Sequence, residues 1–147
     1  MLRIKPSTTL ASLQAILLLL FISVSSVQAV EKQKVVYHLS SIDNIGLVLT
    51  NAHFHVQGVG GPENVDLIVV VNGAAIKGFT KQNFNPALQG QFDDLKAKGV
   101  HFEACGNALQ FFKLSVDDLV PGFTPLPQGG VARLGELQMH GYGYIRP

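Results

Sequence analysis

The sequence has a single cysteine, Cys105, no tryptophan and only two methionines in 147 residues. One cysteine cannot form an intramolecular disulfide. It also excludes two-thiol redox chemistry and zinc sites built from several cysteines, because each of these requires a second sulfur. Any chemistry of Cys105 must therefore involve this thiol alone or a second molecule.

Charged residues are also few, at 14% of the chain, and the 11 basic and 10 acidic residues nearly balance. This balance favours neither a nucleic-acid partner nor attraction to an anionic membrane surface. The sequence contains no Ser-His-Asp order, no paired-carboxylate motif and no spacing of metal ligands. We therefore expect no nucleic-acid partner, no cofactor and no bound metal.

The long hydrophobic run of the sequence lies at its N-terminus. Arg3 and Lys5 precede an apolar stretch at residues 15–22, and Val27-Gln28-Ala29 has the small-x-small pattern of a cleavage site. These are the parts of a secretory signal peptide, so residues 1–29 are predicted to be removed during export to the periplasm. The alternative is an uncleaved anchor, because the run could be extended toward the ~20 residues that span a bilayer.

Cleavage after Ala29 would leave residues 30–147, a chain of 118 residues. This length supports one hydrophobic core and is too short for two domains. The removed segment contains Arg3 and Lys5 but no acidic residue, so nine basic and ten acidic residues give the remainder a net charge of −1. We expect a single domain with no stable membrane association after cleavage.

The remaining chain alternates β-branched or aromatic runs with segments of helical periodicity. The predicted strands cover residues 34–39, 64–71, 100–104, 123–127 and 142–145. This alternation predicts an α/β fold, with a parallel sheet covered by helices on both faces. The second strand is almost wholly apolar and is predicted to be central, whereas the prolines of residues 123–127 predict an edge strand.

Helices are predicted between these strands. Asp43 begins a segment in which Ile45, Leu49, Ala52 and Val56 share one helix face, and Asn85-Pro86 caps a second helix that ends at Gly99. A short helical segment continues to Phe112. In the last predicted helix Val131, Leu134 and Leu137 share a face, and Gly141 ends it.

Ligands of open parallel sheets bind beyond the carboxyl ends of the strands. The polar and glycine residues expected there are His38, Asn72, Gly73, Cys105, Gly106 and Asn107. If Asn107 caps the helix that follows, free backbone N–H groups and the helix dipole would stabilise a thiolate on Cys105. Gly106 would leave room beside the sulfur for a reactant. The alternative is that Cys105 is a small buried hydrophobic residue.

The histidines are predicted to have different roles. His38 would approach Cys105 if the first and third strands lie near each other, where it could hold a thiolate or transfer a proton. Its alternative is a hydrogen bond to a nearby loop. His53 and His55 project from different sides of a helix and so are not expected to share a metal. His140 is expected to interact with a helix C-terminus.

Three segments resemble the DsrE/DsrF-like family of sulfur-relay proteins. They are Phe102-Glu103-Ala104-Cys105-Gly106-Asn107-Ala108-Leu109, Asp118-Leu119-Val120-Pro121-Gly122 and Gly141-Tyr142-Gly143-Tyr144-Ile145. The first two predicted strands are also similar to those of that family, so the resemblance extends over residues 30–147. It implies a three-layer α/β/α sandwich on a five-stranded, mainly parallel sheet, and assembly into homo-oligomers, either trimers or hexamers.

Active members of that family hold sulfur as a persulfide on a cysteine, and Cys105 resembles that position. The resemblance implies a sulfur carrier or sulfurtransferase-like protein with Cys105 as the sulfur acceptor, and the predicted position of His38 makes it the second candidate catalytic residue. Asn72, Gly73, Gly106 and Asn107 would form the substrate-binding pocket. Export departs from the cytoplasmic pathways of the family and favours sulfide, thiosulfate, polysulfide or the thiol of a donor or acceptor protein as partner. The alternative is a non-catalytic oligomeric module of the same fold that binds a ligand or a protein.

Overall fold

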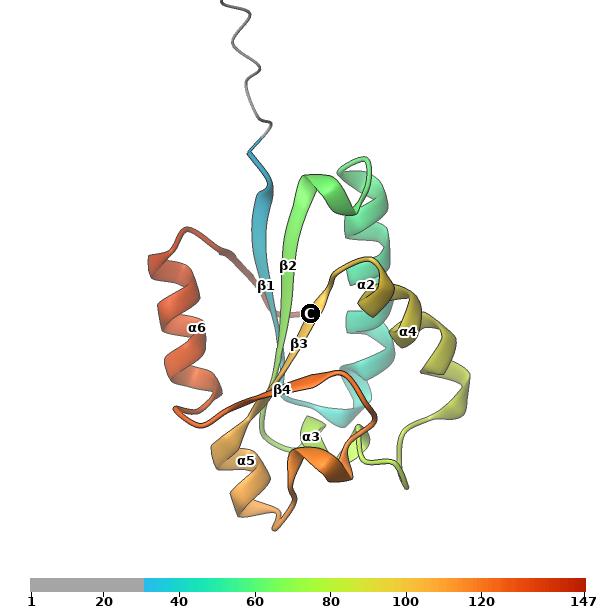
Figure 1. Ribbon diagram of the computed structural model, residues 1–147, viewed down its shortest axis with the longest axis vertical. Helices are drawn as coiled ribbons and strands as arrows, with labels where there is room; N and C mark the ends of the chain where they lie inside the picture. The colour runs from blue at the N-terminus through green and yellow to red at the C-terminus, as the bar shows by residue number, and fades with distance from the viewer. Residues whose placement is uncertain (1–30) are drawn as a thin grey trace, which may run out of the picture. The chain divides into compact units, whose positions relative to one another are not determined.

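The structure is a computed structural model that describes residues 31–147. The predicted signal peptide and its cleavage site after Ala29 lie outside the described residues. Five strands form one sheet in the order β4-β3-β2-β1-β5, and each neighbouring pair is parallel (Figure 1). The strands are β1 (Gln33–Leu39), β2 (Val65–Val71), β3 (His101–Cys105), β4 (Phe123–Leu126) and β5 (Gly143–Ile145).

Helices cover both faces of this sheet, so the predicted α/β/α sandwich is confirmed. The α-helices are α2 (Ile45–Gly58), α3 (Ala75–Gly78), α4 (Gln89–Ala97), α5 (Gly106–Phe111) and α6 (Gly130–Met139). Helices α2 and α4 cover one face, α6 covers the other, and the short α3 and α5 lie at the carboxyl ends of the strands (Figure 1). Helix α3 was not predicted, because a single turn has too few residues to show helical periodicity.

The strands occupy the positions that their composition predicts. β2 is the middle strand of the sheet, and Val69, Val70 and Val71 are fully buried. β4 lies at one edge, where Pro125 needs no ladder partner on its outer side. Both predictions made from the sequence are therefore confirmed.

The second predicted helix begins as expected. The Asn85 side chain accepts a hydrogen bond of 3.0 Å from the Ala87 N–H, and Pro86 opens a 3-10 turn (Pro86–Leu88) that leads into α4. Gly99 follows the helix with a positive φ of 82°, a conformation that glycine adopts without steric cost. The cap and the stop signal thus bound this helix as predicted.

Helix α6 differs from its prediction in one residue. Its buried face is formed by Gly130, Leu134 and Leu137, which are spaced by four and three residues. Val131 was expected on that face but is 74% exposed. The reason is that Gly130 is the residue that faces the sheet in the first turn of α6. Glycine has no apolar side chain, so the hydrophobic pattern of the sequence did not include it.

The two faces of the sheet have different cores. Five phenylalanines pack together on the α2 and α4 side, with the Phe92 and Phe102 ring centroids 4.5 Å apart. This aromatic cluster consists of Phe79, Phe84, Phe92, Phe102 and Phe123. On the α6 side a smaller apolar cluster contains Val36, Ile68, Val70, Leu126, Leu134 and Leu137. Most of the hydrophobic burial therefore lies on the α2 and α4 side.

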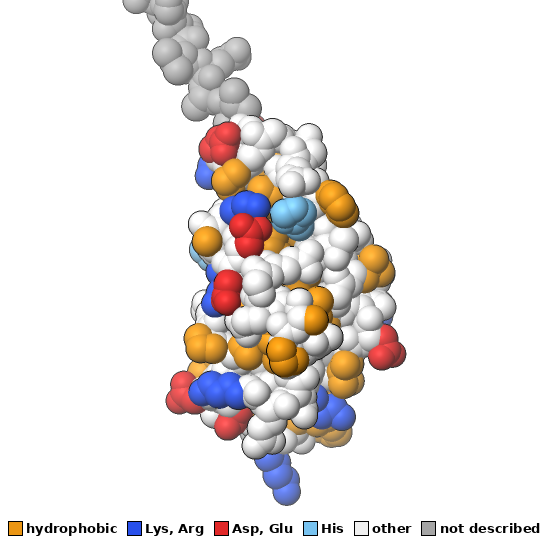
Figure 2. All heavy atoms as spheres, turned by 90° about the vertical axis from the view of Figure 1, so that its right-hand side faces the viewer, with side chains coloured by type: hydrophobic (Ala, Val, Ile, Leu, Met, Phe, Trp, Pro, Cys, Tyr) orange, Lys and Arg blue, Asp and Glu red, His pale blue; other side chains and the backbone are white. Residues whose placement is uncertain are grey.

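The outer surface of the α2 and α4 side has hydrophobic side chains in several separate places (Figure 2). Leu47 and Phe54 of α2 are among the exposed large hydrophobic residues. Across residues 31–147, none of the helices has both the length and the apolar character needed to cross a membrane.

Candidate functional site

Cys105 is the last residue of β3 and the residue that directly precedes α5. Its side chain is buried at 6% exposure and contacts the larger core cluster. The backbone N–H of Gly130, at the start of α6, donates a hydrogen bond of 3.1 Å to Sγ. The thiol therefore lies where the carboxyl end of a central strand meets the N-terminus of a ten-residue helix.

The helix N-terminus that contacts the sulfur is not the predicted one. Asn107 was expected to cap the helix after β3, but Cys105 itself is the N-cap of α5, and Asn107 is an exposed residue inside the first turn. The prediction failed because α6 is 25 residues away in the sequence. Only the folded sheet brings Gly130 to the sulfur.

Asn107 instead lies beside the turn that leads into α6. A Cβ placed on Gly129 would be 2.6 Å from Nδ2 of Asn107, and Gly129 has a positive φ of 90°. Both the close neighbour and the backbone conformation favour glycine at this position. Asn107 thus flanks the Gly129–Gly130 turn, next to Cys105 in the sequence.

Gly106 does not leave space for a reactant, contrary to the prediction. A Cβ at Gly106 would lie 2.6 Å from the carbonyl oxygen of Leu126, so the end of β4 fills this space. Gly130 is similarly confined, because a Cβ there would lie 3.2 Å from Cβ of Cys105 and 3.3 Å from Cβ of Asn72. Both glycines permit close contact between backbone segments, and Gly130 fits between the side chains of Cys105 and Asn72.

His38 contacts Asn72 and not Cys105. β2 separates β1 from β3, and the His38 Nε2 lies 3.0 Å from Oδ1 of Asn72. Because Oδ1 only accepts, Nε2 is the donor, and Nδ1 accepts a 2.6 Å hydrogen bond from the Tyr144 hydroxyl when the ring is neutral. The expected direct approach to Cys105 is therefore absent, and Asn72 stands between the two residues.

Gly73, the remaining predicted site residue, makes the turn after β2. Its φ is 52°, and a Cβ there would lie 3.3 Å from the carbonyl oxygen of Ser40. Gly73 therefore allows the chain to turn closely past the end of β1.

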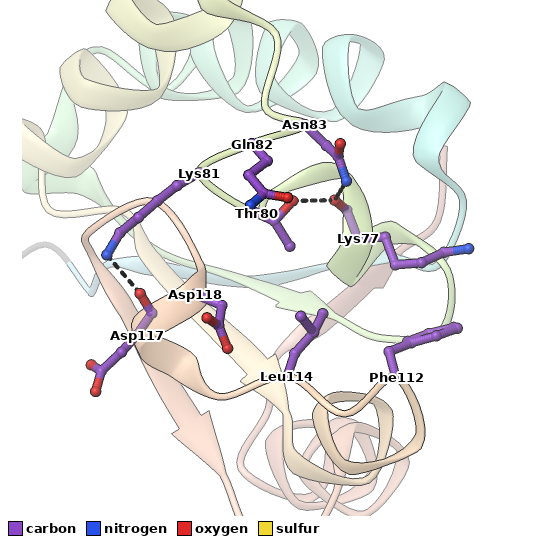
Figure 3. Close-up of a pocket in the computed structure, with 9 residues that line it drawn as sticks. All are labelled: Lys77, Thr80, Lys81, Gln82, Asn83, Phe112, Leu114, Asp117 and Asp118. Carbon is purple, nitrogen blue, oxygen red and sulfur yellow. Dashed lines mark hydrogen bonds between the residues drawn. The ribbon is translucent and has the colours of Figure 1, made fainter.

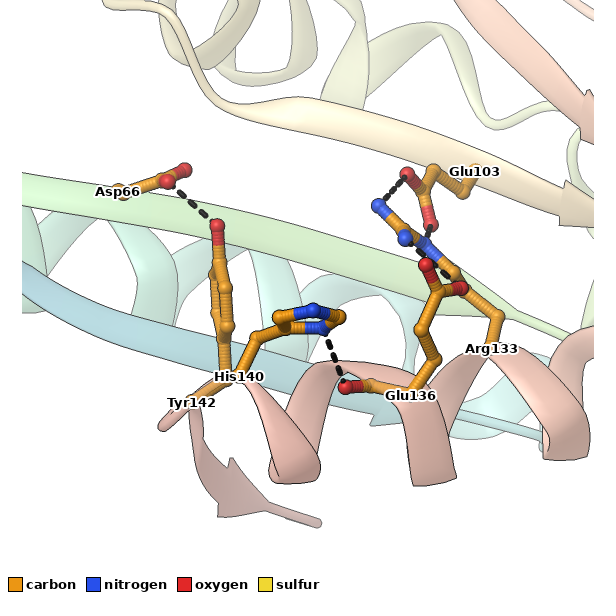
Figure 4. A network of polar contacts seen from close by, with 6 residues as sticks. All are labelled: Asp66, Glu103, Arg133, Glu136, His140 and Tyr142. Atoms are coloured by element: carbon orange, nitrogen blue, oxygen red, sulfur yellow. Dashed lines mark hydrogen bonds and ion pairs between the residues drawn. The ribbon is translucent and has the colours of Figure 1, made fainter.

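An ion pair that was not predicted from the sequence lies close to the thiol, between Glu103 of β3 and Arg133 of α6. Glu103 of β3 is only 8% exposed, and its two carboxylate oxygens accept hydrogen bonds of 2.9 and 3.0 Å from Nε and Nη2 of Arg133 (Figure 4). Nη1 of Arg133 also lies 3.0 Å from Glu136. The bond to Glu103 raises the pKa of Arg133, as does Glu136, so the guanidinium remains charged. A signal existed in the sequence, because Glu103 is an acidic residue inside the otherwise apolar run Phe102–Cys105.

A second polar contact on the α6 side joins Tyr142 to Asp66, whose carboxylate accepts the phenol hydrogen bond (Figure 4). Burial and the neighbouring carboxylate raise the pKa of Tyr142 to about 12, so the phenol stays protonated. Nδ1 of His140 donates a 2.9 Å hydrogen bond to the Glu136 carbonyl, which confirms its predicted contact with the helix C-terminus. These contacts join α6 and its following loop to the sheet and to each other.

The described residues also form a pocket of about 420 Å³ between the segment after α3 and the segment after α5 (Figure 3). Its polar groups largely bond to each other. Nζ of Lys81 donates to the Asp117 carbonyl at 2.6 Å, and Thr80 and Asn83 both donate to the Lys77 carbonyl. Cys105 and the other predicted site residues do not line this pocket.

The histidines of α2 have protein partners. Nδ1 of His55 contacts the Tyr37 hydroxyl and its Nε2 contacts Oε1 of Gln33, whereas His53 lies 3.5 Å from Asp94. Within residues 31–147, His, Cys, Asp and Glu side chains do not gather in any group of three that could hold a metal ion. The site is therefore a single buried thiol with one backbone donor, flanked by Asn72 and, beyond it, by His38.

Comparisons with known proteins agree with this fold. The model of the DsrE/DsrF-like family matches residues 19–147. Protein MTH1491 of unknown function from Methanobacterium thermoautotrophicum has a similar structure, with a TM-score of 0.69 and 24% identity over 79% of this chain and 100% of its own. The ychN protein from E. coli has a TM-score of 0.59 and 16% identity over 78% of this chain and 99% of its own. No curated protein sequence matches the chain.

Proposed function

This chain belongs to the DsrE/DsrF-like family, and we propose that it carries sulfane sulfur as a persulfide on Cys105. The observation that carries the proposal is the position of the thiol at the carboxyl end of β3, with the Gly130 N–H donated to Sγ. Ligand sites of parallel sheets form at this end, and backbone donors at a helix N-terminus favour an anionic sulfur. The Gly130 N–H therefore supports the thiolate that accepts the sulfur; in the loaded state the negative charge lies on the outer sulfur, one atom beyond Sγ.

The proposed loading step needs no oxidant. The thiol proton passes to solvent, and the Cys105 thiolate attacks the outer sulfur of thiosulfate. A bond forms between Sγ and that sulfur, the S–S bond of thiosulfate breaks, and sulfite leaves with the bonding electron pair. With polysulfide the shortened polysulfide leaves in the same way. Unloading is the attack of an acceptor thiolate on the carried sulfur, with the Cys105 thiolate as the leaving group.

Intact-mass measurement tests this proposal. The protein is exposed to thiosulfate or polysulfide and compared with the Cys105→Ser variant, which lacks the acceptor sulfur. We expect the mass of added sulfur on the unaltered protein and none on the variant. No added sulfur on the unaltered protein, or the same addition on both proteins, would contradict the proposal.

A second candidate is a non-catalytic module that binds a ligand or a protein through the same fold. The burial of Cys105 favours this alternative, since a packed cysteine is commonly inert. No acid–base side chain hydrogen-bonds to Sγ among the described residues, so the thiol would depend on backbone groups alone. Cys105 that resists alkylation unless denaturant is present would favour this reading over the carrier.

Export and self-association are further parts of the proposal. Export to the periplasm, with a mature N-terminus near Val30, would give Cys105 small sulfur species or the thiol of a partner protein as reactants. The exposed Leu47 and Phe54 of α2 are suitable for contact with a second copy in a trimer or hexamer. N-terminal sequencing checks the first expectation and light scattering the second. Recovery of Met1 on a membrane-bound product, or a strictly monomeric mass, would contradict them.

A further inference from the structure

Two contacts join the same pair of elements, β3 and α6, on one side of the sheet. Glu103 and Cys105 are two residues apart on β3, so their side chains project from the same face. Gly130 and Arg133 are three residues apart on α6, about one turn of the helix. The Gly130 N–H bonds to the sulfur and the Arg133 guanidinium bonds to the carboxylate. The ion pair therefore joins α6 to β3 about one helical turn from the helix end that covers the thiol.

We propose that Glu103 and Arg133 are positioning residues, whose ion pair holds the Gly129–Gly130 turn over Cys105 and so controls access to the thiol. Cys105 is almost completely buried, and a Cβ added to Gly130 would lie only 3.2 Å from Cβ of Cys105, so the turn packs closely on this side chain. A reactant cannot reach Sγ until this turn moves. The proposal rests on the proposed function in that both concern reaction at the same sulfur.

The geometry of the ion pair suits this role. Two parallel hydrogen bonds from one guanidinium to one carboxylate fix orientation as well as distance. Both side chains are largely shielded from solvent, so salt screens their attraction less than that of a surface pair. Because Glu103 belongs to the sheet, the pair restrains α6 against β3 and thereby restrains the turn that precedes Arg133.

Glu136 supplies a matched control. It also pairs with Arg133, at 3.0 Å, but it lies on α6 itself and its side chain is 46% exposed. Replacing Glu136 with Gln removes a negative charge near the same guanidinium without releasing α6 from the sheet. A purely electrostatic influence on the thiol would respond to both carboxylates, whereas positioning depends on Glu103.

The test is the rate of alkylation of Cys105 by iodoacetamide at one pH in the unaltered protein, Glu103→Gln and Glu136→Gln. We expect Glu103→Gln to react roughly tenfold faster, because the turn opens more often, and Glu136→Gln to change the rate less than about twofold. The rates are repeated at low urea concentrations. Reaction through local opening depends weakly on urea, whereas reaction through global unfolding rises steeply with it.

Three outcomes would overturn the proposal: equal rates in all three proteins, equal acceleration in both variants, or acceleration in Glu103→Gln that depends steeply on urea. Sulfur loading is measured separately on the same three proteins by intact mass. If Glu103→Gln speeds alkylation but no protein takes up sulfur, the control of access stands and the carrier function fails. If sulfur loads without any effect of Glu103→Gln, the carrier function stands and the positioning role fails.

Discussion

The two faces of the sheet are covered by different kinds of side chains. On the α2 and α4 side the strands bury an aromatic cluster of five phenylalanines within the larger core. On the α6 side a small apolar cluster shares the interface with the Glu103–Arg133 ion pair, the Tyr142–Asp66 contact and the thiol of Cys105. Stability is therefore expected to come mainly from the first face, and reactivity to be concentrated at the carboxyl end of the second.

This division follows from connectivity. A single helix, α6, covers its side of the sheet. It begins at Gly129 and Gly130, whose backbone N–H groups lie close to the ends of β4 and β3. Two helices cover the other side, α2 with 14 residues and α4 with nine, and they contact each other. A face covered by one helix can open locally at lower cost than a face held by two, because fewer apolar contacts are broken.

The largest effect should come from breaking the aromatic cluster. Phe92→Ala removes a fully buried ring that contacts the rings of Phe79, Phe84, Phe102 and Phe123, and we expect a loss of about 3–5 kcal/mol in the free energy of unfolding. Urea denaturation measures it. Leu134→Ala is the counterpart on the α6 side and should cost less, because its cluster is smaller. An equal or greater cost for Leu134→Ala would contradict the division of the two faces.

An intermediate effect is expected at the turn over the thiol. Gly130→Ala places a methyl group within 3.2–3.3 Å of Cys105, Asn72 and Val70, and we expect a loss of about 1–3 kcal/mol together with faster alkylation of Cys105. Gly135→Ala is the control on the same helix. Its Cβ would meet nothing within 4 Å, so it should gain about 0.5–1 kcal/mol from helix propensity and leave alkylation unchanged. Equal changes in stability and in alkylation rate for the two variants would show that the close contact at Gly130 does not control access to Cys105.

The smallest effect concerns pH and the α2 side. Burial lowers the pKa of His55 below its ordinary value of 6.5, so the folded state binds fewer protons than the unfolded state in this range. Stability due to neutral His55 is present above pH 6.5 and is lost as pH falls through that value toward the lower folded pKa. We expect a small loss in the free energy of unfolding between pH 7.5 and pH 5.5, measured by urea denaturation, and a smaller loss in His55→Gln. An equal loss in both proteins would assign the effect to other groups.

Much of the fold could be predicted from the sequence because its signals are local. The apolar run of β2 predicted a central strand, the prolines of β4 an edge strand, and Asn85-Pro86 a helix start. The alternation of strands and helices then required a parallel sheet. These features depend on neighbours in the chain, which the sequence displays directly.

The candidate site could be predicted only in part. Ligand sites of parallel sheets lie at the carboxyl ends of the strands, and this rule correctly predicted that Cys105 and Asn72 lie at that end of the sheet. The hydrogen-bond donor to the sulfur was not predicted, because it is the backbone N–H of Gly130, a residue distant in sequence and without a side chain. The ion pair between Glu103 and Arg133 likewise joins residues 30 positions apart. The predicted roles of Asn107 and Gly106 were wrong because both were inferred from their nearest neighbours, whereas α6 and the end of β4 fill the space around the thiol.

A transfer experiment with thiosulfate labelled in its outer sulfur tests the carrier role of Cys105 most directly. We expect the unaltered protein to take up one labelled sulfur at Cys105, a thiol acceptor then to remove it, and Cys105→Ser to take up none. Stable label that no thiol acceptor removes, or equal label on both proteins, would contradict a carrier role for Cys105.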